Sequence, residues 1–282
     1  MTGTTLEVVL RRDRAIVAFS IAVLTVIAWI YILWFARSMD MGDAAMAGMD
    51  MDSMAGMDMG GDASGMSMTS GLQPWSPSEF LFMFAMWVVM MIGMMTPSAA
   101  PMILLYARVG RQSELQGKPL AATGYFFAGY VLAWTGFALL ATLGQWTLES
   151  TLLLTPMMAS ASRFFSGCLL IAIGLFQWTP LKDVCLRQCQ APFMFIQQHG
   201  GFRRDPMGSL SIGFRHGLYC IGCCWALMAL LFVGGVMNIV WIAAIAIYVL
   251  VEKIIPGGPW LSRLTGIGLG LAGIWLLGTA IR

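Results

Sequence analysis

Charged residues are scarce in this chain of 282 residues. Asp, Glu, Lys and Arg make up 11% of it and hydrophobic residues 59%, whereas a typical soluble domain is about a quarter charged and about half apolar. This composition excludes an ordinary soluble globular domain. The net charge of +2 is too small to suggest nucleic-acid binding. The sequence also lacks a phosphate-binding loop and an aspartyl-phosphorylation motif, so any transport is predicted to be passive or ion-coupled.

The apolar residues come in seven blocks close to the length of a membrane span. A helix needs about 20 residues to cross the hydrocarbon core, and the strands of a barrel would instead show a period of two. The predicted fold is therefore all-α, a polytopic transmembrane helix bundle of about seven spans. The blocks are Ile16–Phe35, Phe80–Leu105, Leu120–Leu143, Phe164–Trp178, Leu210–Val233, Val236–Val251 and Leu264–Ile281.

The distribution of basic residues predicts the orientation of the bundle. Thirteen of the 16 Lys and Arg fall on the side of the N-terminus when the spans alternate, and cytoplasmic loops are the basic ones. The N-terminus is therefore predicted to be cytoplasmic and the C-terminus outside, in a bacterial inner membrane. The expected parts are the N-terminus with the first span (1–36), an extracytoplasmic loop (37–78) and a six-span membrane domain (79–282) with a cytoplasmic loop (179–209).

The extracytoplasmic loop has an unusual composition. Residues 39–68 contain ten Met and six Asp but no Lys, Arg, aromatic or β-branched residue, which predicts disorder in the absence of a ligand. Thioether sulfur is a soft ligand that suits copper(I) far better than magnesium or calcium. A calcium loop is a competing interpretation of the Asp residues, but its bidentate Glu is missing, and a plain linker is another. The candidate ligands in this loop are Met49, Met51, Met54, Met57 and Met59.

Methionines also recur along the second span. The pairs Met90–Met94 and Met91–Met95 each place two sulfurs one helical turn apart. This spacing is similar to the MxxxM motif in the pore helix of high-affinity eukaryotic copper transporters. Packing between helices is the alternative, because Met packs well there. The TPSAAP sequence that follows carries two prolines and predicts an inward-facing break in the helix.

The fifth span carries the first of two cysteine groups. His216, Cys220, Cys223 and Cys224 lie at positions i, i+4, i+7 and i+8, which places them on one helical face. Thiolate and imidazole ligands there suit copper(I), with zinc or another soft metal as the alternative. We therefore predict a metal site on this face.

The second cysteine group lies in the cytoplasmic loop. Cys185 and Cys189, together with His199, form a second candidate site at the mouth of the bundle. Buried cysteine is also a common packing residue, so structural roles remain the alternative for both groups.

Three charged residues lie at or near the ends of spans. Arg215 precedes the histidine of the fifth span, and Glu252 and Lys253 follow the sixth span. Charges at such depth usually pair with one another. We expect a structural Glu252–Arg215 pair, with a gate or proton-coupling role as the alternative.

Three strings of the sequence resemble a bacterial family of predicted metal-binding integral membrane proteins. They are MMTPSAAPMILLYARV, KDVCLRQCQAPF and GLYCIGCCWALMALLFVGGVMNIVWIAAIAIYVLVEK. The resemblance covers about residues 80–282 and implies a helical membrane fold with a metal link through its cysteines. It does not imply which metal, and the Met/Asp loop lies outside it.

These features together predict a metal-binding inner-membrane protein for copper(I) acquisition, transport or delivery, rather than an enzyme. The expected partners are membrane lipid, an extracytoplasmic copper donor and a cytoplasmic acceptor; nucleic acid is not expected, and a homo-oligomer is left open. Two alternatives remain. One is an assembly factor that metallates a copper enzyme, and the other is a membrane thiol-disulfide oxidoreductase that uses the Cys220-x2-Cys223 spacing.

Overall fold

The computed structural model describes residues 3–47, 75–117, 123–151, 160, 162–255 and 260–280. Helices hold nearly all of these residues and no β-strand occurs among them, which confirms the predicted all-α class. The helices are α1 (Gly3–Ala47), α3 (Pro77–Leu115), α4 (Thr123–Ser150), α5 (Arg163–Phe176), α6 (Pro180–Gln190), α7 (Pro192–Gln198), α8 (Pro206–Ala229), α9 (Leu231–Gly234), α10 (Ile239–Ile254) and α11 (Trp260–Ala280).

Five stretches of helix are long and apolar enough to cross a membrane. Helices α5 and α6 meet this condition only as a pair bent by 64°, so the count rises to six if the pair forms one span. Helix α10 has 16 residues, fewer than the roughly 20 that a straight span needs. By length and composition the described residues thus give five or six spans, against about seven predicted. The five stretches are Ala15–Arg37, Pro77–Glu114, Thr123–Ser150, Pro206–Gly234 and Trp260–Ala280.

Side-chain caps fix the start of several helices. Ser76 and Glu79 form a capping box at the start of α3, in which each side chain accepts a hydrogen bond from the other residue's backbone N–H. Thr179 and Asp205 cap α6 and α8 by accepting from the backbone N–H three residues later. A proline follows each of these three caps, at the first helical position, where its missing N–H would be unpaired in any case.

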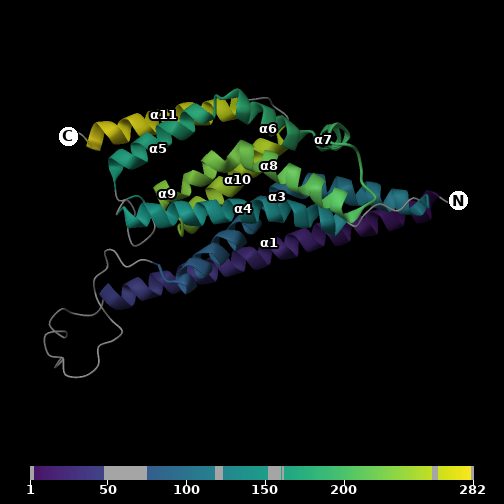
Figure 1. Ribbon diagram of the computed structural model, residues 1–282, viewed down its shortest axis with the longest axis horizontal. Helices are drawn as coiled ribbons and strands as arrows, with labels where there is room; N and C mark the ends of the chain where they lie inside the picture. The colour runs from purple at the N-terminus through teal and green to yellow at the C-terminus, as the bar shows by residue number, and fades with distance from the viewer. Residues whose placement is uncertain are drawn as a thin grey trace, which may run out of the picture.

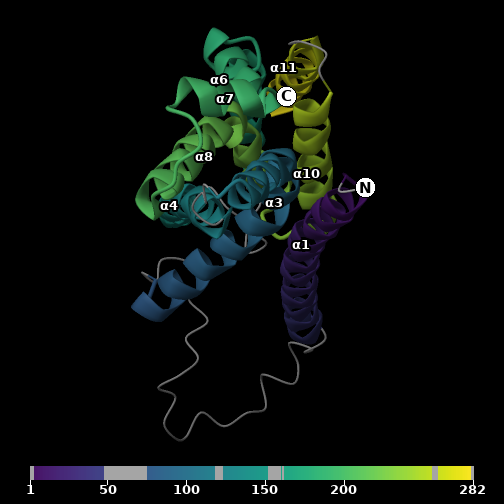
Figure 2. The same cartoon turned by 90° about the vertical axis from the view of Figure 1, so that its right-hand side faces the viewer.

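The helices pack as neighbouring pairs (Figure 1). Helix α1 runs along α3, α4 along α8 and α5 along α11, while α6 lies on α8 and α10 on α3. Figure 1 shows α5 and α11 together at one side of the molecule, with α6 leading back to the remaining helices, and Figure 2 shows α6 and α11 at the same side. Helix α1 begins and α11 ends at opposite ends of the bundle. Which end faces the cytoplasm stays a prediction from the basic residues.

Glycines allow α4 and α8 to approach very closely. A Cβ atom at Gly213 would lie 1.9 Å from the carbonyl oxygen of Phe126, and one at Gly129 would lie 2.0 Å from that of Leu210. Both distances are far below van der Waals contact, so any other residue would force the backbones apart. The close approach brings the cysteine face of α8 against α4.

Three local expectations differ from the structure. Helix α3 runs without interruption through the TPSAAP sequence, with Pro97 and Pro101 inside it, so the helix does not end there. The predicted cytoplasmic loop (179–209) is largely helical and forms α6 and α7. Helix α1 continues to Ala47, so the first part of the Met/Asp segment is helical rather than disordered. The candidate ligands of that segment, Met49, Met51, Met54, Met57 and Met59, lie outside the described residues.

Candidate metal site

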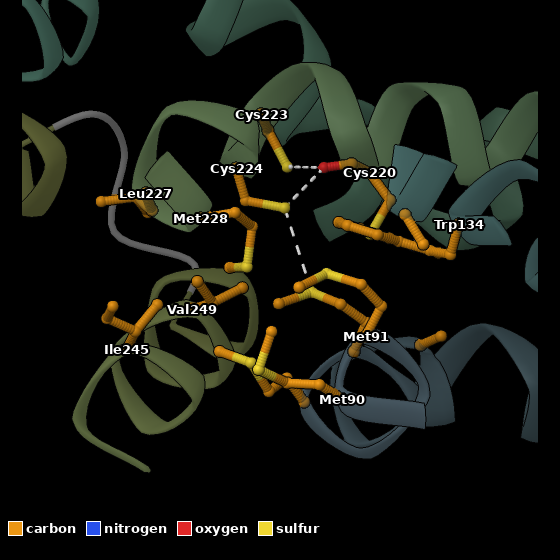
Figure 3. Close-up of a cluster of buried hydrophobic side chains, with 14 of the residues drawn as sticks. Met90, Met91, Trp134, Cys220, Cys223, Cys224, Leu227, Met228, Ile245 and Val249 are labelled. Atoms are coloured by element: carbon orange, nitrogen blue, oxygen red, sulfur yellow. Dashed lines mark hydrogen bonds between the residues drawn. The ribbon is translucent and has the colours of Figure 1, made fainter. Parts of the chain in front are cut away.

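The methionines of α3 form a buried row. Met90, Met91, Met94 and Met95 are each at most 1% exposed, because their spacing keeps them on the face of α3 that meets the rest of the bundle. Figure 3 shows Met90 and Met91 in one cluster with Met228 of α8 and residues of α10. The row therefore places thioether sulfur in the core, where the sulfurs can pack against other side chains or ligate a metal ion.

The cysteines of α8 meet this row. Cys220, Cys223 and Cys224 are at most 1% exposed, as the helical spacing predicted. The Cys223 and Cys224 thiols donate to the carbonyl oxygen of Cys220, at 3.1 and 2.8 Å (Figure 3). The sulfur of Cys224 also lies 4.0 Å from the sulfur of Met95. The thioethers of α3 thus lie directly beside the thiols of α8.

Helix α6 brings a further cysteine into the same cluster. The sulfur of Cys189 lies 4.0 Å from that of Cys223. Cys185 is buried against α8, where a Cβ atom at Gly222 would lie 2.7 Å from its sulfur. The two predicted cysteine groups therefore lie together.

His199 does not join them. One of its ring nitrogens lies 2.8 Å from the carbonyl oxygen of Phe195, and its ring stacks on that of Phe195. This contact is local to α7, so the structure does not support the predicted Cys185–Cys189–His199 site.

Two sulfur pairs have a separation that one metal ion spans. An ion about 2.3 Å from each of two thiolates holds the sulfurs up to about 4.6 Å apart, so the 4.0 Å separations in the Cys189–Cys223 and Cys224–Met95 pairs fit a soft ion. Within the described ranges, no three His, Cys, Asp or Glu side chains are arranged to ligate one ion.

His216 lies at the edge of this cluster. It is 3% exposed and is surrounded by the rings of Phe126, Tyr130 and Phe195. Its Nδ1 atom has no hydrogen-bond partner among the described residues. A buried ring nitrogen without a partner is costly, and ligation of a metal ion is one way to satisfy it.

Two polar side chains contact the thiol of Cys220, and the sequence alone pointed to only one of them. The Lys253 ammonium donates to the Cys220 sulfur at 2.8 Å and to the Ser98 hydroxyl at 3.1 Å. The Tyr130 hydroxyl lies 3.2 Å from the same sulfur and also donates to the carbonyl of Met95 at 3.1 Å. The predicted charge at Lys253 is therefore part of the sulfur cluster, whereas Tyr130 on α4 gave no sequence signal.

A second buried cluster surrounds Glu252. Its Oε1 atom lies 2.6 Å from the Lys182 ammonium and accepts from the Ser262 hydroxyl at 2.6 Å and the Tyr248 hydroxyl at 3.0 Å. Arg215 is exposed, so the predicted Glu252–Arg215 pair is wrong and Lys182 is the partner. The pair links α6 to α10, directly beside the sulfur cluster.

A third polar group lies near the N-terminal end of the methionine row. The indole N–H of Trp87 donates to Gln145 at 2.7 Å, and the Gln145 amide donates to Glu149 at 2.8 Å. The indole N–H of Trp75 donates to the other oxygen of Glu149 at 2.8 Å, and the sulfur of Met83 lies 3.9 Å from the Gln145 amide nitrogen. This group joins the start of α3 to the end of α4, next to the Met/Asp segment in sequence.

The fold and the buried sulfur define a class, a helical protein of membrane character with thiol and thioether groups in its core. Residues 84–276 match the model of the family described as the copper chaperone PpoB2. The match covers more than half of the chain, and the chain belongs to this copper chaperone family. This confirms the predicted link to copper. No curated protein and no solved structure matches the chain significantly.

Proposed function

We propose that the protein takes up copper(I) within its membrane helices and delivers it, through the sulfur cluster, to an acceptor protein. The observation that carries this proposal is the meeting of three helices through sulfur. Met95 of α3 lies 4.0 Å from Cys224 of α8, and Cys223 of α8 lies 4.0 Å from Cys189 of α6. Copper(I) is the cargo here, and soft sulfur ligands suit it best.

The geometry supports a path for the ion. Met83 and Met95 are twelve positions apart on α3, which is about 18 Å along the helix axis and more than half of a hydrocarbon core about 30 Å thick. Neutral thioethers line this distance, and thiols follow at its end. Because thiolate attracts a cation more strongly than thioether does, the ion would move from the weaker ligands to the stronger ones without ATP.

The Met/Asp segment supports the same direction. It precedes α3 in the sequence, and the Glu149–Gln145 group lies where the methionine row begins. We infer that the segment collects copper outside the cytoplasm of a bacterial cell and that the row carries the ion inward. The description of the family as a copper chaperone favours delivery to a protein over release into the cytoplasm.

Copper analysis of the purified chain tests the site. The full chain in detergent is loaded with copper(I) under reducing conditions, and bound copper and its ligands are measured by elemental analysis and X-ray absorption. Wild type is expected to bind copper through sulfur, and Cys223→Ser to lose most of it. Cys168→Ser is the matched control, because Cys168 is exposed on α5. Equal copper in wild type and Cys223→Ser would contradict the proposal.

Movement across the membrane needs a separate test. Vesicles that contain wild type or Cys220→Ser are incubated with copper(I), and the copper retained inside is measured. Greater uptake by wild type would show transport, whereas equal uptake with a normal copper content in purified wild type would restrict the function to delivery.

A further inference from the structure

Lys253 is a buried cation that donates hydrogen bonds to a thiol and a hydroxyl. It is 7% exposed, and in the part of the chain that the structure describes no Asp or Glu lies within ion-pair distance of it. Its ammonium contacts the Cys220 sulfur at 2.8 Å and the Ser98 hydroxyl at 3.1 Å. The other thiols of the cluster lie next to Cys220, because Cys223 and Cys224 donate to its carbonyl oxygen and Cys189 lies 4.0 Å from Cys223.

The other buried lysine has a different environment. Lys182 is fully buried and lies 2.6 Å from the carboxylate of Glu252, which balances its charge. Among the described residues, Lys253 donates only to a neutral hydroxyl and to a thiol. A buried charge that lacks a counter-charge is strongly unfavourable, so an anion formed by the cysteines is the partner that this position accommodates best.

We propose that Lys253 is a specificity-determining residue, which balances the charge of a monovalent ion held by two thiolates and so selects copper(I) over divalent zinc. This inference rests on the proposed function and names the class of ion that the site prefers. Two thiolates and copper(I) leave one negative charge, which the ammonium neutralises. Two thiolates and zinc are already neutral, so the ammonium adds an unbalanced positive charge in the core.

The size of the effect follows from Coulomb's law. One charge about 5 Å from the ammonium, at an effective dielectric constant of about 20, changes the binding constant by at most about two-hundredfold. Neutralising Lys253 is therefore expected to weaken copper(I) binding by about tenfold to a hundredfold. Zinc binding would change little, because the zinc–dithiolate centre has no net charge. The absence of a third convergent Cys, His, Asp or Glu ligand among the described residues agrees with this preference, since zinc favours four ligands.

Two variants neutralise the charge by different routes. Lys253→Gln removes the ammonium. Ser98→Asp keeps Lys253 but places a carboxylate where the Ser98 hydroxyl lies 3.1 Å from the ammonium. Both are expected to weaken copper(I) binding, measured in the full-length chain by competition with a chromophoric copper(I) chelator, and to leave zinc binding, measured with a zinc indicator, within about threefold of wild type. Lys253→Arg keeps the charge and is expected to retain the preference for copper(I).

The control is Arg263→Gln, which removes a half-exposed cation that pairs with Asp183 and contacts no thiol and should leave the ratio of copper(I) to zinc affinity unchanged. If Lys253→Gln or Ser98→Asp folds and keeps the wild-type ratio, or loses both metals equally, the charge-balance role of Lys253 is wrong while the copper site stands. If wild type itself binds no copper(I) through its cysteines, the proposed function fails first. The two failures are therefore distinguishable.

Discussion

The glycine contact between α4 and α8 allows a quantitative prediction. In Gly213→Ala the new Cβ atom would lie 1.9 Å from the carbonyl oxygen of Phe126, and also 2.8 Å from its carbonyl carbon. Real Cβ contacts do not fall below 3.0 Å, so the helices must move apart by about 1.1 Å, the difference between 3.0 and 1.9 Å. The obstructing atoms belong to the backbone, which cannot rotate away as a side chain would.

The expected cost is a large part of the stability of a small bundle. Overpacking typically destabilises by about 1–3 kcal/mol, and this backbone clash belongs at the upper end. Because alanine has a higher helix propensity than glycine, it offsets up to about 1 kcal/mol of this loss. We therefore expect Gly213→Ala to lower the free energy of unfolding by about 2 kcal/mol or more. The same movement would stretch the 3.2 Å contact between the Tyr130 hydroxyl and the Cys220 sulfur beyond hydrogen-bonding distance.

Denaturant unfolding of the purified protein in detergent, followed by circular dichroism, measures this change. The matched control is Gly136→Ala on α4, where a Cβ atom would meet nothing within 4 Å. That variant should be neutral, or more stable by about 0.5–1 kcal/mol. If Gly213→Ala is as stable as Gly136→Ala, the close packing of α4 on α8 is not as described, and the position of Tyr130 beside Cys220 must be abandoned with it.

Three further predictions concern single side chains. Met95→Leu preserves volume and should change the free energy of unfolding by less than about 1.5 kcal/mol, yet slow the arrival of copper(I) at the cysteines by about tenfold, measured by protection of the thiols from alkylation. Glu252→Gln leaves Lys182 buried without its counter-charge and should destabilise the protein to denaturant by about 3–5 kcal/mol; adding Lys182→Met should recover most of that loss. Glu149→Gln removes the carboxylate that Gln145 and an indole contact; copper bound at equilibrium should not change, but loading in the alkylation assay should slow several-fold.

Helical periodicity accounts for what the sequence predicted correctly about the core. The spacing of Met90, Met91, Met94 and Met95, and of the cysteines after His216, decides which sides of α3 and α8 turn inward, and all of these residues are buried. The same rule explains why the predicted Glu252–Arg215 pair is wrong. Successive residues on a helix point about 100° apart, so Arg215 turns outward when His216 turns inward.

Contacts between distant segments could not be predicted in this way. Cys189 reaches Cys223 only because the chain bends by 64° between α5 and α6 and then lays α6 on α8. Nothing local in the sequence sets that angle. The segment around Cys189 is polar enough to resemble a loop, so its sequence predicts a separate site for the thiols of Cys185 and Cys189. Lys182 lies in the same predicted loop, although the structure buries it fully.

The two buried clusters depend on the same two helices. Helix α6 carries both Lys182 and Cys189, and α10 carries Glu252 and Lys253 at adjacent positions. The Lys182–Glu252 ion pair therefore holds α6 against α10. Through α6 it fixes Cys189 near the thiols of α8, and through α10 it fixes the Lys253 ammonium on Cys220. Because adjacent residues of α10 serve the two clusters, a movement that breaks the ion pair also moves the charge beside the sulfur. The ion pair thus positions the sulfur cluster even though neither of its members belongs to that cluster.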